Sequence, residues 1–95
     1  MTRNVASVLL LCCLAACAGA PVQEMSDARQ AIAAARAAGA PSRAPEDFLA
    51  AKAAIERAET RLQDHDYAGA RSAAVEAKHD ASVALAQSQG AAATR

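Results

Sequence analysis

Bulky and small apolar residues recur along this chain at helical spacing. Three segments place one bulky residue, then small or aliphatic residues, at positions i, i+3, i+7 and i+10, and they begin at Met25, Phe48 and Tyr67. Residues at these spacings share one face of an α-helix. Strand signals are absent, because there is no apolar alternation and there are few β-branched residues. The pattern therefore predicts an all-α domain built from three helices.

Proline, glycine and acidic residues mark where these helices begin and end. Pro45 suits a first helical turn, where a missing N–H costs nothing, and acidic residues follow it. Gly39 and Gly90 stand where C-terminal caps are expected, and Asp66 is the expected N-cap of the last helix. These signals predict helices over about 22–38, 45–64 and 66–89, followed by a disordered tail over 90–95.

The three apolar stripes predict how the helices pack. Three such stripes facing one another, with short connections, form an up-down-up three-helix bundle. Alanine at most stripe positions gives a thin core with Tyr67 as a core aromatic, and basic residues at the stripe edges cover apolar surface with their stems. Because so few large residues are buried, self-association or a partner is expected to supply further burial. The stripe residues are Met25, Ala28, Ile32 and Ala35; Phe48, Ala51, Ile55 and Ala58; and Tyr67, Ala70, Ala74 and Ala77, with edge bases Arg29, Lys52 and Arg71.

The first 16 residues have the pattern of a secretion signal. One positive charge at Arg3 precedes an apolar run of about a dozen residues from Val5 to Ala16. This run is too short for a membrane-spanning helix, which needs about 20 apolar residues. Residues 1–16 are therefore predicted to be a signal peptide.

The end of that run resembles a bacterial lipobox. Leu14, Ala15 and Ala16 form the signal peptidase recognition sequence directly before Cys17. The chemistry needs a thiol at the future N-terminus and small residues before it. The resemblance implies that Cys17 becomes the first residue, carries diacylglycerol on sulfur and an acyl chain on its amine, and opens a lipidated tether over 17–21. An ordinary secretory signal and an uncleaved anchor remain the alternatives.

Composition and charge exclude several classes of protein. The 95 residues are 54% apolar but only 2% aromatic, and the difference is largely alanine. Ten basic residues balance ten acidic ones, so there is no global field to attract nucleic acid. The length excludes an ordinary catalytic α/β domain, and four glycines leave no phosphate-binding loop.

No polar cluster has the pattern of a catalytic or metal site. The densest one runs from Asp64 to Tyr67 and is interpreted as a turn and helix cap. His79 would lie about 20 Å from His65 along the last helix, too far to share an ion. Glu56 and Glu59 are interpreted as a solvated face. We therefore expect no enzyme activity, no catalytic residues, no metal, no cofactor and no small-molecule substrate.

A family resemblance covers residues 21–86. Ala44-Pro45-Glu46, the stripe after it, and Asp66-Tyr67 followed by Ala70 resemble small bacterial lipoproteins of domain of unknown function 4398. The segment Asp66 to Ala70 is also similar to the turn into the second helix of a tetratricopeptide-repeat hairpin. The family resemblance implies an envelope lipoprotein and no catalytic residues.

These features predict a non-catalytic helical module of the bacterial envelope. Resemblance to Gram-negative lipoproteins, with Ala18 rather than aspartate after Cys17, implies attachment at the periplasmic face of the outer membrane. The module would recruit or brace an envelope component, with the lipid anchor as its membrane contact. The alternatives are a self-assembling structural lipoprotein and an accessory subunit of a periplasmic enzyme.

Overall fold

The computed structural model describes residues 19–93, and this part of the chain is almost entirely helical. Its elements are α2 (Val22–Ala37), α3 (Ala40–Arg43), α4 (Pro45–Gln63) and α5 (Tyr67–Ala93). No strand occurs among the residues described. The predicted all-α class is therefore confirmed.

The starts of α4 and α5 follow the predicted punctuation. Pro45 occupies the first turn of α4, where Glu46 and Asp47 also lie near the positive end of the helix. Asp66 precedes α5, and its carboxylate accepts a hydrogen bond from the Gly69 N–H at 2.9 Å. That bond joins an N-cap to the third helical residue, which confirms the cap at Asp66.

The connection after α2 contains a short helix that the sequence did not predict. Gly39 has φ +88°, a left-handed conformation that glycine adopts without steric cost. Its N–H donates to the Arg36 carbonyl at 3.0 Å and closes the end of α2. Pro41, in the first turn of α3, has a ring-fixed φ compatible with helix. The predicted linker therefore folds into one further turn, α3, rather than an irregular loop.

The C-terminal prediction is wrong for the residues described. Gly90 lies inside α5, which continues to Ala93, four residues beyond the predicted end at Gln89. Glycine costs a helix about 1 kcal/mol relative to alanine, and the three alanines after it have the highest helix propensity. The alanine run therefore offsets the single glycine. Residues 94 and 95 lie outside the described part.

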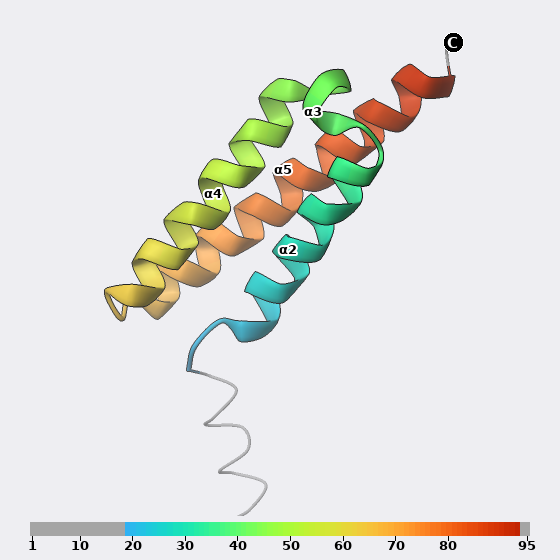
Figure 1. Cartoon of the computed structure of the whole chain (residues 1–95). Coiled ribbons are helices and arrows are strands. Elements are labelled where there is room, and N and C mark those ends of the chain that lie inside the picture. The colour runs from blue at the N-terminus through green and yellow to red at the C-terminus, as the bar shows by residue number, and fades with distance from the viewer. Residues whose placement is uncertain (1–18, 94–95) are drawn as a thin grey trace, which may run out of the picture.

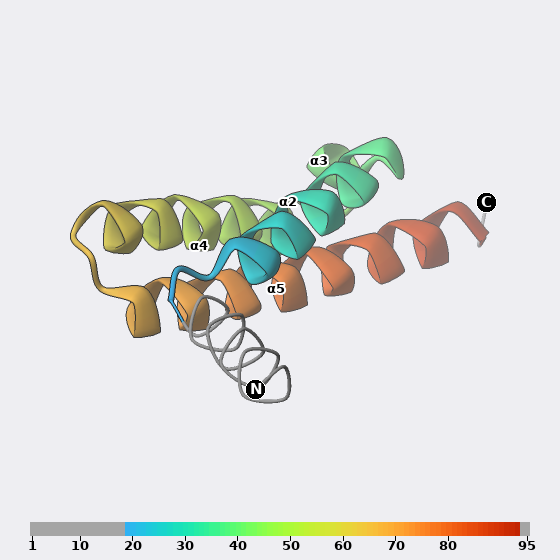
Figure 2. The same cartoon turned by 90° about the horizontal axis from the view of Figure 1, so that it is seen from below.

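Helix α5 is the element on which the other helices lie. Figures 1 and 2 show α4 and α5 side by side and antiparallel, joined by the tight turn at 64–66. Helix α2 runs in the same direction as α5 and contacts it more extensively than it contacts α4. The start of α2 and the α4–α5 turn therefore lie toward the same end of the molecule.

The core consists of four large side chains among alanines. Met25 and Ile32 come from α2, and Phe48 and Ile55 come from α4. Every other residue of this cluster is alanine, including all of those supplied by α5. Because alanine adds little bulk at the contacts, helices of this composition approach each other near the lower end of the usual 8–10 Å range.

The predicted stripes are buried except for one residue. Tyr67 was expected in the core but is 38% exposed. It is the first residue of α5, next to the turn, and its ring lies 6.2 Å from the ring of His65. The prediction for Tyr67 is wrong because the residue stands at the first position of α5, where the helix begins and packing leaves its side chain partly exposed.

Candidate functional site

The predicted lipidation residues Leu14, Ala15, Ala16 and Cys17 lie outside the described residues. The closest described residue is Gly19, and its carbonyl accepts a hydrogen bond from Arg71 Nη2 at 3.0 Å. Arg71 Nε also donates to Glu24 Oε1 at 3.1 Å, so one guanidinium holds both the tether and the first turn of α2. The end of the tether is therefore fixed against α5.

A groove between α2 and α4 is the clearest concave feature with an apolar floor. Ile32 of α2 and Ile55 of α4, which are 7% and 9% exposed, form the floor, and Ala33 lies beside them. The groove has a volume of about 250 Å³. It exists because α2 and α4 both lie on α5 and contact each other less.

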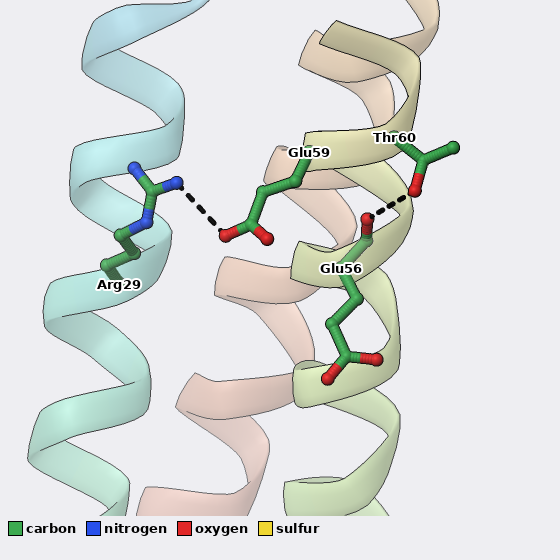
Figure 3. A network of polar contacts seen from close by, with 4 residues as sticks. All are labelled: Arg29, Glu56, Glu59 and Thr60. Atoms are coloured by element: carbon green, nitrogen blue, oxygen red, sulfur yellow. Dashed lines mark hydrogen bonds and ion pairs between the residues drawn. The ribbon is translucent and has the colours of Figure 1, made fainter. Parts of the chain in front are cut away.

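Basic side chains line the rim of this groove. Arg29 and Arg36 come from α2, and Lys52 comes from α4. Arg29 Nη2 forms an ion pair with Glu59 Oε1 at 3.1 Å (Figure 3), and both residues line the groove. The Arg36 guanidinium lies over the Phe48 ring, 5.4 Å from its centroid. Among the residues described, no carboxylate pairs with Arg36 or Lys52.

This local charge differs from the charge of the domain around it. Arg3 and Arg95 lie outside the described part, which leaves eight basic and ten acidic residues within 19–93. The groove nevertheless carries three cations against one carboxylate among its lining residues. The arrangement is therefore suited to contact an anionic, partly apolar group.

The two carboxylates of α4 that follow Lys52 have different surroundings. Glu59 reaches across to α2, whereas the Glu56 side chain projects along α4 (Figure 3). The Glu56 backbone carbonyl accepts a hydrogen bond from Thr60 Oγ1 at 3.2 Å. Both carboxylates are solvent-accessible, and neither faces the other as an acid–base pair would.

Ion pairs connect each pair of long helices. Arg29–Glu59 links α2 with α4, Glu24–Arg71 links α2 with α5, and Arg57–Glu76 links α4 with α5 at 2.9 Å. The apolar spacing predicted Arg29 and Arg71 at stripe edges but not their partners, which are 30 and 47 positions away in the sequence. One ion pair therefore lies at each contact between the long helices.

The turn from Asp64 to Tyr67 serves as a cap, as the sequence indicated. The hydrogen bond from the Gly69 N–H and the nearby Arg61 guanidinium lower the pKa of Asp66 below its ordinary value. Arg61 Nη1 lies 3.0 Å from Asp66 Oδ2. Over residues 19–93, no group of three or more His, Cys, Asp or Glu side chains has the arrangement to hold a metal ion.

Sequence reasoning missed the groove, although part of its signal was present. Arg29 and Arg36 are seven residues apart and so share one face of α2. Lys52, Ile55 and Glu59 share a face of α4 in the same way. These spacings show which residues line each wall, but only the placement of both helices on α5 brings the walls together.

None of the helices described is both long enough and apolar enough to cross a membrane. The fold and its surface define a small all-α domain with an alanine core and a basic groove. The chain belongs to the family described as Domain of unknown function (DUF4398), which matches residues 23–95. Searches of curated proteins and of solved structures found no match.

Proposed function

We propose that this chain is a lipid-anchored, non-catalytic binding module of the bacterial envelope. Residues 1–16 would direct export, and Cys17 would carry the diacylglycerol and N-acyl chains at the periplasmic face of the outer membrane. The three long helices would act as an up-down-up bundle that recruits or braces an envelope component. The resemblance of the chain to small bacterial lipoproteins of this family supports the proposal.

The main support for the proposal is that the predicted lipobox lies directly before the helical domain. Cys17 stands two residues before Gly19, whose carbonyl Arg71 binds, and five residues before the start of α2. An acylated cysteine at this place would hold the whole domain beside the membrane. Two or more acyl chains give stable attachment, whereas one gives only marginal attachment.

The groove between α2 and α4 supports a binding role. Binding sites are concave and mostly apolar, with a few polar groups that fix orientation. Ile32 and Ile55 supply the apolar floor, and Arg36 and Lys52 supply polar groups on opposite walls.

Replacing the thiol tests the anchor. Cys17→Ser should abolish incorporation of labelled fatty acid and leave the precursor unprocessed, because a hydroxyl does not replace the thiol. Cys12→Ser is the matched control, since it removes a thiol five residues earlier within the same apolar run and should leave lipidation intact. A Cys17→Ser chain that is still cleaved before residue 17 and stays membrane-bound would contradict the proposal.

The outward face of α5 favours self-assembly as a second candidate function. Val75 is among the exposed large apolar residues of the part described, and the exposed residues in line with it on α5 include His79 and the small residues Ser72, Ser82 and Ala86. Uncharged small residues let helices from two chains approach closely. Sedimentation of the full chain in a neutral detergent tests this candidate. A monomer at every concentration would exclude it.

A further inference from the structure

The groove between α2 and α4 has the dimensions of a site for side chains rather than for a whole small molecule. Its volume of about 250 Å³ is below the roughly 300–1,000 Å³ of typical small-molecule sites. It extends from Arg29 to Arg36, seven residues or about 10 Å along α2. Two turns of a helix present side chains over the same length.

The helices around the groove leave a place for another helix. Residues of α2 and α4 line the two sides of the groove above Ile32 and Ile55, and both helices pack on α5. A helix laid along this groove would contact both walls, as each member of a four-helix bundle contacts two neighbours. Its apolar residues would cover Ile32 and Ile55.

The basic residues at the rim of the groove favour a partner helix with acidic flanks. Arg36 and Lys52 lie on opposite walls and have no carboxylate partner among the described residues, while Arg29 is already paired with Glu59. Carboxylates on both flanks of an apolar stripe would meet these two cations. Basic flanks would meet charges of the same sign, which costs binding energy.

We propose that the groove binds an acidic amphipathic helix of a partner protein. Apolar side chains of that helix rest on Ile32 and Ile55, and its carboxylates meet Arg36 and Lys52. This inference rests on the proposed binding function and names the class of partner.

An anionic lipid surface fits the groove less well. Recognition of anionic membranes uses clusters of about 4–8 basic residues. The groove offers three, one of them paired, on a domain whose described residues are acidic overall. Its cations also flank a concave apolar floor, whereas a bilayer presents a broad surface.

Peptide binding to the full chain in a neutral detergent tests the inference. Two synthetic helical peptides share one leucine stripe, and their flanks carry glutamate in one and lysine in the other. The acidic peptide should bind about tenfold more tightly than the basic one by fluorescence anisotropy. Equal affinity, or no binding of the acidic peptide, would overturn the inference.

Charge reversal locates the binding. Lys52→Glu should weaken binding of the acidic peptide about tenfold. Lys78→Glu is the matched control, because Lys78 is exposed on α5, lies outside the groove and should leave affinity unchanged. On the unchanged chain, the acidic peptide should shift amide resonances of residues 29–36 and 52–59, a readout that needs no variant. Shifts elsewhere, or full affinity in Lys52→Glu, would contradict the groove.

Two further experiments distinguish a lipid site from a peptide site, and the groove from the proposed anchor. Vesicles of phosphatidylglycerol that shift the groove resonances while the acidic peptide does not would identify a lipid site and overturn the inference. Cys17→Ser separates this inference from the proposed anchor. If that variant binds the acidic peptide normally yet remains membrane-bound after processing, the anchor fails and the groove stands.

Discussion

At the scale of single residues, the α4–α5 turn contains the clearest conformational constraint. His65 has φ +61°, in the left-handed region. Its N–H donates to the Leu62 carbonyl at 3.0 Å, and the Asp66 N–H donates to the Arg61 carbonyl at 2.8 Å. These two bonds form a Schellman motif, in which glycine is usual at the left-handed position. Both hydrogen bonds of the turn are therefore made, but His65 has a steric cost at the left-handed position that glycine would not have.

Replacing that histidine should stabilise the domain. His65→Gly removes the clash between Cβ and the backbone, and part of the gain is lost to the greater entropy of glycine in the unfolded chain. We expect the free energy of unfolding to rise by about 0.5–1 kcal/mol in urea titrations. His79→Gly is the matched control, because His79 lies within α5 and glycine there should lower stability by about 0.5 kcal/mol. Equal effects at both positions would contradict this account.

Asp66 predicts a dependence of stability on pH. Because its folded pKa lies below the ordinary value, the folded chain binds protons less readily than the unfolded chain. The stabilisation is fully present above the unfolded pKa, about 3.9, and is lost as pH falls through the lower folded pKa. The melting temperature should therefore decline below about pH 4, and Asp66→Asn should reduce the decline. Identical melting profiles of both chains between pH 2 and 6 would show that the cap does not titrate.

At the scale of elements, the apolar stripes that begin at Met25 and Phe48 correctly predicted the buried faces of α2 and α4. Met25, Ile32, Phe48 and Ile55 could be identified from spacing alone, since each falls within a long helix. The same spacing failed at Tyr67, which begins α5 and is 38% exposed. Two helical segments were missed: α3 is a separate turn that forms after Gly39 has closed α2, and α5 continues past Gly90 because alanines follow it.

Phe48 should be the most sensitive position of α4. It is buried among alanines, which have no side-chain atoms able to move into its space, and the Arg36 guanidinium lies over its ring. Phe→Ala in a core costs about 3–5 kcal/mol, comparable to the stability of a small domain. Phe48→Ala should lose much of its helical circular dichroism near 25 °C. Leu49→Ala, at a neighbouring residue that is 63% exposed, should melt like the parent.

At the scale of the whole molecule, the three ion pairs lie at all three contacts between the long helices and contribute little to the stability of the fold. Their side chains are about one-third to one-half exposed, and exposed pairs typically contribute about 0.2–1 kcal/mol each. The groove also depends on the arrangement of the whole molecule, because it forms where α2 and α4 lie side by side on α5. Neither feature could be predicted from the sequence: the ion pairs join residues 19 to 47 positions apart, and the groove brings together residues from two separate helices.

Arg71 should control the order of the N-terminal segment. Arg71→Ala removes both the bond to the Gly19 carbonyl and the pair with Glu24, so the first turn of α2 should open more often. Hydrogen exchange at the Val22 and Met25 amides should accelerate, with a loss of stability of about 1 kcal/mol or less. Arg57→Ala is the control, because it removes an α4–α5 pair and should leave those amides unchanged. Equal exchange in both variants would show that Arg71 does not hold the segment.

The bond between Arg71 and Gly19 also limits how far the protein can reach. With Cys17 acylated, only two residue steps separate the lipid from a fixed point on α5, a span of about 7 Å. The 27 residues of α5 extend about 40 Å. If Cys17 carries the proposed lipid anchor, every surface of the domain would stay within roughly 50 Å of the bilayer, even with α5 upright. The protein would then meet only molecules that come to this layer, so the membrane, and not a search through the compartment, would set its place of action.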